Sequence, residues 1–156
     1  MAKSTFSGPV ISNNGLVAAG SGNVINITAE TTLTFDAHAG RVIEVNDADG
    51  AVTLPSITSD NIGAVYTIFV GTDATDLDIK TDGTDKFVGS VVLGVNNGTM
   101  KVFQPASTND VISLNGGTTG GDKNSYVQAT ALATAEYLVQ GVLIGSGTIA
   151  TPFADA

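Results

Sequence analysis

Carboxylates are the most plentiful side chains in this sequence that could take part in chemistry. Five aspartates fall within one short stretch and two more flank a turn: Asp73, Asp76, Asp78, Asp82, Asp85, Asp47 and Asp49. A hard cation such as calcium needs several oxygen ligands that converge on one point. The EF-hand pattern is not met, and Asp76 and Asp78 share one face of an alternating strand, which is also typical of a solvated surface. We expect no metal site, and Asp73, Asp76 and Asp78 are the residues to inspect for a cation.

A catalytic triad would have to use His38, the single histidine, with Asp36 two residues before it. No Gly-x-Ser-x-Gly elbow occurs, and the serines are numerous enough to give such pairings by chance. We therefore interpret His38 as a solvated residue in the turn at 36–40. A glycosidase pair of carboxylates stays open, because its partners meet only in three dimensions. The absence of Trp and an aromatic content of 6% weigh against a sugar site.

Several other classes of site lack the residues they need. Cysteine is absent, which excludes disulfides, thiolate metal sites and cysteine nucleophiles, and one histidine is too few for a conventional zinc site. The glycine-rich segments 115–122 and 145–148 lack the endings of phosphate-binding loops. Six Lys and Arg against fifteen Asp and Glu give a net charge of −9, which repels nucleic-acid backbones. We predict no catalytic residues, no cofactor and no nucleic-acid partner.

Short apolar runs between turn signals predict an all-β fold. Glycine is abundant (19 residues), and the runs alternate or are rich in Val, Ile and Thr. We predict strands over 24–28, 32–35, 41–45, 51–54, 65–70, 76–80, 87–93, 100–103, 111–114, 126–130 and 137–144. The Ala- and Leu-rich stretch at 129–139 is the one possible helix, but it has no cap, and we interpret 131–136 as a turn. The pattern favours an antiparallel β-sandwich or barrel, jelly-roll-like.

The chain divides into an arm and one domain. Residues 1–23 are rich in Ser, Gly and Asn with isolated apolar side chains, which is typical either of a frayed terminus or of an extended arm that orders on a partner. We predict such an arm over 1–23 and a single β-domain over 24–156 with a short C-terminal tail. Charged residues make up only 13% of the sequence, which suits a protein whose surface is covered by partners. No targeting signal or apolar stretch of membrane-spanning length occurs, so we expect no membrane partner.

Several segments resemble β-rich structural proteins of tailed bacteriophages. They are 33–47 (LTFDAHAGRVIEVND), 51–55 (AVTLP), 63–70 (GAVYTIFV) and 77–80 (LDIK). The opening 1–10 (MAKSTFSGPV) and the segment 145–153 (GSGTIATPF) are similar to virion proteins of marine cyanophages and their relatives. The resemblance covers most of the chain, but its motifs mark turns and strands. One departure is Tyr137, which stands where such modules often carry a Trp.

The resemblance implies a capsid decoration or cement protein on the outer surface of the virion, made in the host cytoplasm. Its arm would lie on the major capsid protein through Phe6, Pro9, Val10 and Ile11. The β-domain would form a homo-oligomer, with a trimer expected because shell junctions often have threefold symmetry. The alternative is a head- or tail-fibre module that recognises a host receptor or glycan through loops 96–98 or 116–121. The chain shows no coiled coil or triple-stranded shaft of the kind a fibre uses.

Overall fold

The computed structural model describes residues 20–95 and 98–156. The predicted capsid contacts Phe6, Pro9, Val10 and Ile11 therefore lie outside the described residues, as do residues 96 and 97 of one predicted receptor loop. The described end of the predicted arm contains only a short 3₁₀ turn, η1 (Ser21–Asn23), which leads directly into the first strand. None of the helices among the described residues is long and apolar enough to cross a bilayer.

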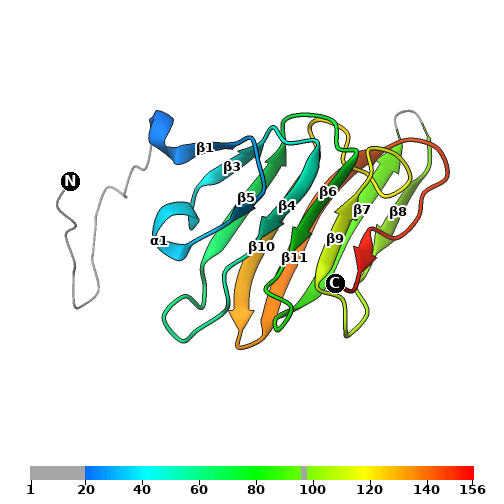
Figure 1. The fold of residues 1–156 in the computed structure, drawn as a ribbon. Helices are drawn as coiled ribbons and strands as arrows, with labels where there is room; N and C mark the ends of the chain where they lie inside the picture. The colour runs from blue at the N-terminus through cyan, green and yellow to red at the C-terminus, as the bar shows by residue number, and fades with distance from the viewer. Residues whose placement is uncertain (1–19, 96–97) are drawn as a thin grey trace, which may run out of the picture.

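Twelve strands in the described part of the chain form two sheets that pack face to face (Figure 1). Sheet A contains, in spatial order, β1 (Val24–Ile27), β3 (Val42–Val45), β5 (Val65–Val70), β10 (Tyr126–Ala133), β11 (Glu136–Gly145), β7 (Lys86–Val95) and β8 (Met100–Phe103). Sheet B contains β12 (Phe153–Ala154), β9 (Val111–Leu114), β6 (Asp76–Lys80), β4 (Asp49–Thr53) and β2 (Thr31–Thr32). The predicted all-β sandwich is confirmed.

The sheets are mixed, whereas the sequence favoured antiparallel pairing throughout. In the first half of the chain, successive strands lie alternately in sheet A and sheet B. Each strand therefore runs in the same direction as the preceding strand of its own sheet. Thus β1, β3 and β5 are parallel neighbours, and so are β2, β4 and β6. Ile25, Ile43 and Ile68 are cross-strand neighbours in these parallel strands. Because unequal lengths of chain separate them, the sequence shows no repeat of fixed period. The second half adds mostly antiparallel strands and one parallel pair, β11 with β7.

Two predicted elements need correction and one interpretation holds in part. The strand at 32–35 is wrong: β2 ends at Thr32, and a one-turn helix, α1 (Phe35–His38), follows. Thr34 begins this turn because its N–H donates to Nδ1 of His38 (2.9 Å). The C-terminal tail contains a strand, β12, which the sequence analysis did not predict. A turn does separate the last two long strands, but it is shorter than the predicted 131–136: β10 continues to Ala133 and β11 begins at Glu136, with Ala135 at φ 65° in the hairpin turn.

Two tyrosines from the motifs meet in the core between the sheets. Tyr66 on β5 and Tyr137 on β11 are both fully buried, and their rings pack edge to face with centroids 6.4 Å apart. The Tyr137 hydroxyl donates a hydrogen bond to the backbone oxygen of Pro55 (2.6 Å). The Thr-Leu-Pro turn is therefore fixed to the centre of sheet A, which lies on the other side of the core.

Candidate functional site

The two residues considered for a triad, Asp36 and His38, belong to one local turn. Asp36 and His38 lie together in the one-turn helix α1, and the ring nitrogen Nδ1 of His38 is used within that turn, where it contacts the backbone and the hydroxyl of Thr34. A nucleophile and a base must lie within hydrogen-bond reach of each other. The serine that comes nearest to a carboxylate, Ser56, donates to Asp82 instead. His38 therefore stabilises a local turn.

The clustered aspartates are spread over β6 and the loops on either side of it, and of these Asp82 and Asp85 share one turn. Asp82 Oδ1 accepts the N–H of Thr84 (2.9 Å), and Asp73 Oδ1 accepts that of Lys123 (2.7 Å). The hydrogen bond from Ser56 holds the pKa of Asp82 below its usual range. In the described part of the chain, no three acidic or histidine side chains are grouped so that they could hold a metal ion. Asp73 and Asp76 are exposed, whereas Asp78 is half-buried and its Oδ1 has no hydrogen-bond partner among the described residues.

Asp85 differs from the other aspartates of this cluster because its residue is only 3% exposed. Its Oδ2 accepts the N–H of Ile57 (2.9 Å), which ties the loop after β4 to the start of β7. Burial raises the pKa of Asp85, although the bond from Ile57 acts in the opposite direction. A carboxyl whose pKa is higher in the folded than in the unfolded state destabilises the fold when it ionises, and this effect disappears as the pH falls through the folded pKa.

Replacing Asp85 with asparagine is therefore expected to stabilise the protein at neutral pH. The amide keeps an oxygen for Ile57 and removes the buried charge, for a gain of about 0.5–1 kcal/mol at pH 7 that fades towards pH 4. Urea unfolding of Asp85→Asn and of the wild type at both pH values measures this, with the exposed Asp60→Asn as the matched control. A variant less stable than the wild type at pH 7 would contradict it.

The predicted receptor loop at 116–121 is held by contacts within itself. The Asn115 side chain accepts the N–H groups of Gly117 (2.9 Å) and Thr119 (3.1 Å) and donates to the Thr118 hydroxyl (3.1 Å). Gly116 has φ 66°, and a Cβ there would lie 2.1 Å from the oxygen of Ala74. Glycine is thus required at this position for close packing of the backbone, which explains the glycine-rich sequence without a bound phosphate.

The outer faces of the two sheets differ in charge. On sheet B, strand β6 points Asp76, Asp78 and Lys80 away from the core. On sheet A, the outward positions of the central strands form rows across the sheet, defined by the cross-strand register. One row is apolar and consists of Phe69, Tyr126, Val142, Val92 and Val102. The next row is polar but uncharged and consists of Thr67, Gln128, Gln140 and Ser90.

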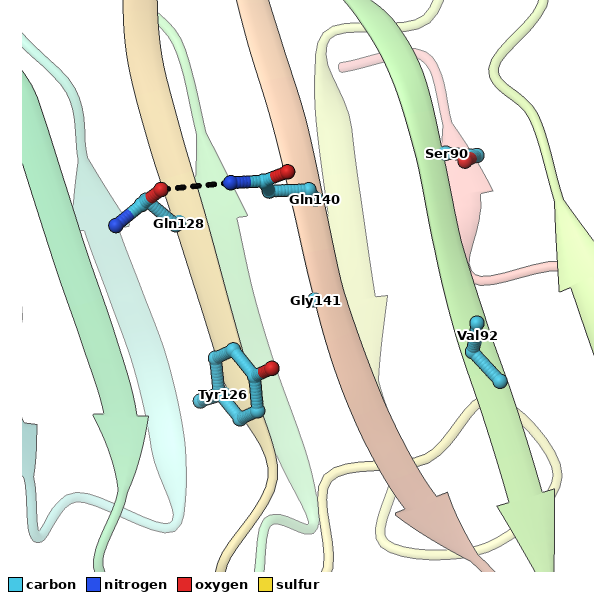
Figure 2. A pocket seen from close by; sticks show the side chains of 6 residues that line it. All are labelled: Ser90, Val92, Tyr126, Gln128, Gln140 and Gly141. Atoms are coloured by element: carbon cyan, nitrogen blue, oxygen red, sulfur yellow. Dashed lines mark hydrogen bonds between the residues drawn. The ribbon is translucent and has the colours of Figure 1, made fainter.

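The polar row is linked by hydrogen bonds, and a hollow lies beside it. Gln140 Nε2 donates to Gln128 Oε1 (2.7 Å), and Gln128 Nε2 donates to the Thr67 hydroxyl (3.3 Å). Figure 2 shows these amides above Tyr126, with Gly141 on β11 at a height between the amides and the tyrosine ring. The hollow has a volume of about 470 Å³. A second hollow of about 540 Å³ adjoins it at Val92 and extends towards Met100 and Lys123.

We define these two rows, with the hollows over them, as the sheet A face. It is the most distinctive surface among the described residues, because its two rows are uncharged and partly apolar. The charged residues Asp122 and Lys123 line only the second hollow, beyond the rows. It presents amides, hydroxyls and aliphatic side chains, which can bind another surface but supply neither an activated nucleophile nor a charge to a reaction. No protein-family model, curated protein or solved structure matches this chain.

The sequence analysis did not identify the sheet A face. Its residues were seen only as outward positions of separate strands, which come from distant parts of the chain. A signal was nevertheless present: the predicted strands at 65–70, 87–93, 126–130 and 137–144 contain no charged residue at all. The strand at 76–80 contains three. Those four strands adjoin one another in sheet A. The short strands at 51–54 and 111–114 of sheet B also lack charge, so the signal includes the sheet A face without singling it out.

Proposed function

We propose that this protein is a non-enzymatic structural component of a virion, which binds the outer surface of a phage capsid and stabilises it as a decoration protein. The observation that carries the proposal is the two-faced sandwich: one outer face bears charges suited to solvent, and the other is neutral and partly apolar. Contiguous apolar surface of this kind marks protein–protein contact. The resemblance of the sequence to phage virion proteins supplies the kind of assembly.

Attachment in this proposal uses the arm, and the β-domain associates with further copies of itself. Phe6, Pro9, Val10 and Ile11 would anchor the arm on the major capsid protein, and the residues 1–19 carry a single charged side chain, Lys3. A protein that binds the assembled shell and not its separated subunits stabilises the shell by mass action. Many weak contacts repeated over a lattice also add up through high local concentration.

Removing residues 1–20 is expected to abolish co-sedimentation with empty shells assembled from the major capsid protein. A full-length variant with Phe6→Ser, Val10→Ser and Ile11→Ser should lose attachment as well, because it lacks the apolar anchors. The matched control carries Ile62→Ser and Leu132→Ser, two exposed apolar residues outside the arm. Circular dichroism establishes that each variant is folded. Saturable binding that survives both arm variants would overturn the arm model.

The alternative function is a fibre module that recognises a host receptor or glycan through its loops. This function has less support, because the side chains of Asn115, Thr118 and Thr119 already form hydrogen bonds within the described loop, to one another or to its backbone. Pelleting of the purified chain with host cells, together with failure to bind shells, would favour the alternative.

A further inference from the structure

We propose that the sheet A face binds the same face of a second copy of this chain, which gives a face-to-face pair. The proposal rests on the self-association that is part of the proposed function; it names the surface responsible and replaces the trimer expected from the resemblance with a twofold pair. Sheets that pack face to face lie about 10 Å apart with their side chains interdigitated. The inner face of sheet A already packs in this way against sheet B, and the outer face of sheet A would form a second layer with its copy.

The first argument is the exposure of large apolar side chains over one part of the sheet. Met100 is 70% exposed, Val102 63%, Tyr126 42% and Val142 38%. Val142 is a cross-strand neighbour of Tyr126 on one side and of Val92 on the other, and Val92 is a neighbour of Val102. These side chains therefore form one continuous strip across β10, β11, β7 and β8. Isolated exposed apolar residues need no explanation, but a continuous strip marks a contact surface.

The second argument is charge. The chain has a net charge of −9, so two copies repel each other unless they meet where the surface is neutral. The apolar row and the polar row contain no charged residue, and neither does the third row, which consists of Val65, Thr130, Leu138 and Val88. The nearest charge in register is Glu44 on β3, opposite Phe69. A basic or acidic partner would gain nothing from such a surface, whereas a second copy avoids repulsion on it.

The third argument is that the polar groups of this face can form hydrogen bonds with the same groups on a second copy. Amides and hydroxyls both donate and accept hydrogen bonds. In a pair with twofold symmetry, each residue meets the same patch of its partner, so a surface must satisfy its own hydrogen-bonding groups. The Gln140 amide donates to Gln128, and its oxygen lies on the side away from Gln128 (Figure 2). The row can thus accept bonds from the donors of an identical row.

The size of the face sets the expected affinity. Five strands about 4.8 Å apart, each contributing about six residues at about 3.4 Å, cover roughly 500 Å² of flat area. A standard stable interface buries about 800 Å² per partner, and weaker ones bury less than about 600 Å². We therefore expect a reversible pair with a dissociation constant in the micromolar range, strengthened where many copies share one shell.

Sedimentation velocity of the full chain between about 1 and 200 µM tests the pairing. The wild type should shift from monomer to dimer over this range. Gln140→Glu preserves shape but places like charges on both sides of the contact, and Val142→Asp does so within the apolar strip. Each should raise the dissociation constant about 100-fold or more. Ser59→Glu adds the same charge at an exposed residue of the loop between β4 and β5, outside the two rows, and should pair like the wild type.

A wild type that stays monomeric at 200 µM, a trimer, or a pair unaffected by Gln140→Glu would each overturn the proposal. Equal weakening by Ser59→Glu would also overturn it, because the effect would then come from net charge alone. If the Val142→Asp variant does not fold, the effect of Gln140→Glu on the dissociation constant is the test of the proposal. Shell binding is measured separately. Pairing without shell binding would refute the capsid function but support the role of the sheet A face in pairing. Shell binding by a protein that stays monomeric would support the capsid function and refute the pairing.

Discussion

Tyr137→Ala is expected to lower the free energy of unfolding by about 4 kcal/mol. Tyr137 is fully buried on β11, it packs edge to face on Tyr66, and its hydroxyl donates to the oxygen of Pro55 (2.6 Å). Truncating a buried aromatic residue leaves a cavity and typically costs about 3–5 kcal/mol. Chemical denaturation at neutral pH measures the loss. Tyr126→Ala makes the same change on the exposed face of β10 and should cost about 1 kcal/mol or less.

Two further variants distinguish the contribution of the Tyr137 ring to stability from that of its hydroxyl. Tyr137→Phe keeps the packing and removes the bond to Pro55, so the expected loss is about 1 kcal/mol. Tyr66→Phe makes the same change, but the Tyr66 hydroxyl is buried without a hydrogen-bond partner among the described residues. Removing a buried unsatisfied hydroxyl should leave stability unchanged or raise it. Equal losses in the two variants would show that the bond to Pro55 contributes nothing.

The positions of most strands could be predicted from the sequence, but their pairing could not. Alternation over a few residues is a local signal, and it placed β5, β6 and β8 to β11 within a few residues of their observed bounds. The same signal does not say which strands pair. The parallel order of β1, β3 and β5 depends on the chain passing through sheet B between them, and nothing in the local pattern of any one strand encodes that path. The preference for antiparallel pairing failed for this reason.

The prediction at 32–35 failed through competition between local and tertiary signals. Thr-Leu-Thr-Phe alternates like a strand, and Leu33 does point into the core, where it is 1% exposed. Its N–H still donates to the oxygen of Thr53 (2.8 Å), which continues the pairing of β2 with β4. The chain then turns because His38 provides Nδ1 as an acceptor for the N–H of Thr34. The end of this strand therefore depends on the side chain of His38, four residues after Thr34 in the sequence.

The candidate sites had a similar outcome. The aspartates and His38 attracted notice because of their chemistry, and the fold uses them in turns. The sheet A face consists of residues that are unremarkable one by one, such as Gln128, Gln140 and Val92. Their significance comes from cross-strand register, which joins segments more than forty residues apart in the sequence. Surfaces of this type are found through the distribution of charge over predicted strands and not through motifs.

The C-terminal strand provides the last prediction, since β12 is held by a buried carboxylate. Asp110 is 4% exposed; its Oδ2 pairs with Lys86 Nζ at 2.5 Å, and its Oδ1 accepts the N–H of Ala156 (2.9 Å). Burial opposes ionisation, but the bonds from Lys86 and Ala156 outweigh it and hold the pKa of Asp110 below its usual range. One side chain thus joins the start of β7 to the residues that follow β12.

Asp110→Asn is expected to lower the free energy of unfolding by about 2 kcal/mol at pH 7, because hydrogen bonds to charged groups contribute about 1.5–3 kcal/mol. A folded pKa below the unfolded one gives stability that is complete above the unfolded pKa and is lost as the pH falls towards the folded value. The difference between Asp110→Asn and the wild type should therefore shrink below about pH 4, near the ordinary pKa of an aspartate. Asp85→Asn should show the opposite sign at neutral pH, since burial raises the pKa of that carboxyl.

Urea unfolding between pH 3 and pH 7 measures both effects in one series. Asp155→Asn is the matched control, because Asp155 is an exposed carboxylate in the same tail that accepts bonds from Thr108 and Asn109. Exposed pairs contribute little, so this variant should follow the wild type closely at every pH. If Asp110→Asn is as stable as the control at pH 7, the pair with Lys86 does not hold β12 in place. If its loss persists undiminished at pH 3, the cause is a packing defect and not the charge.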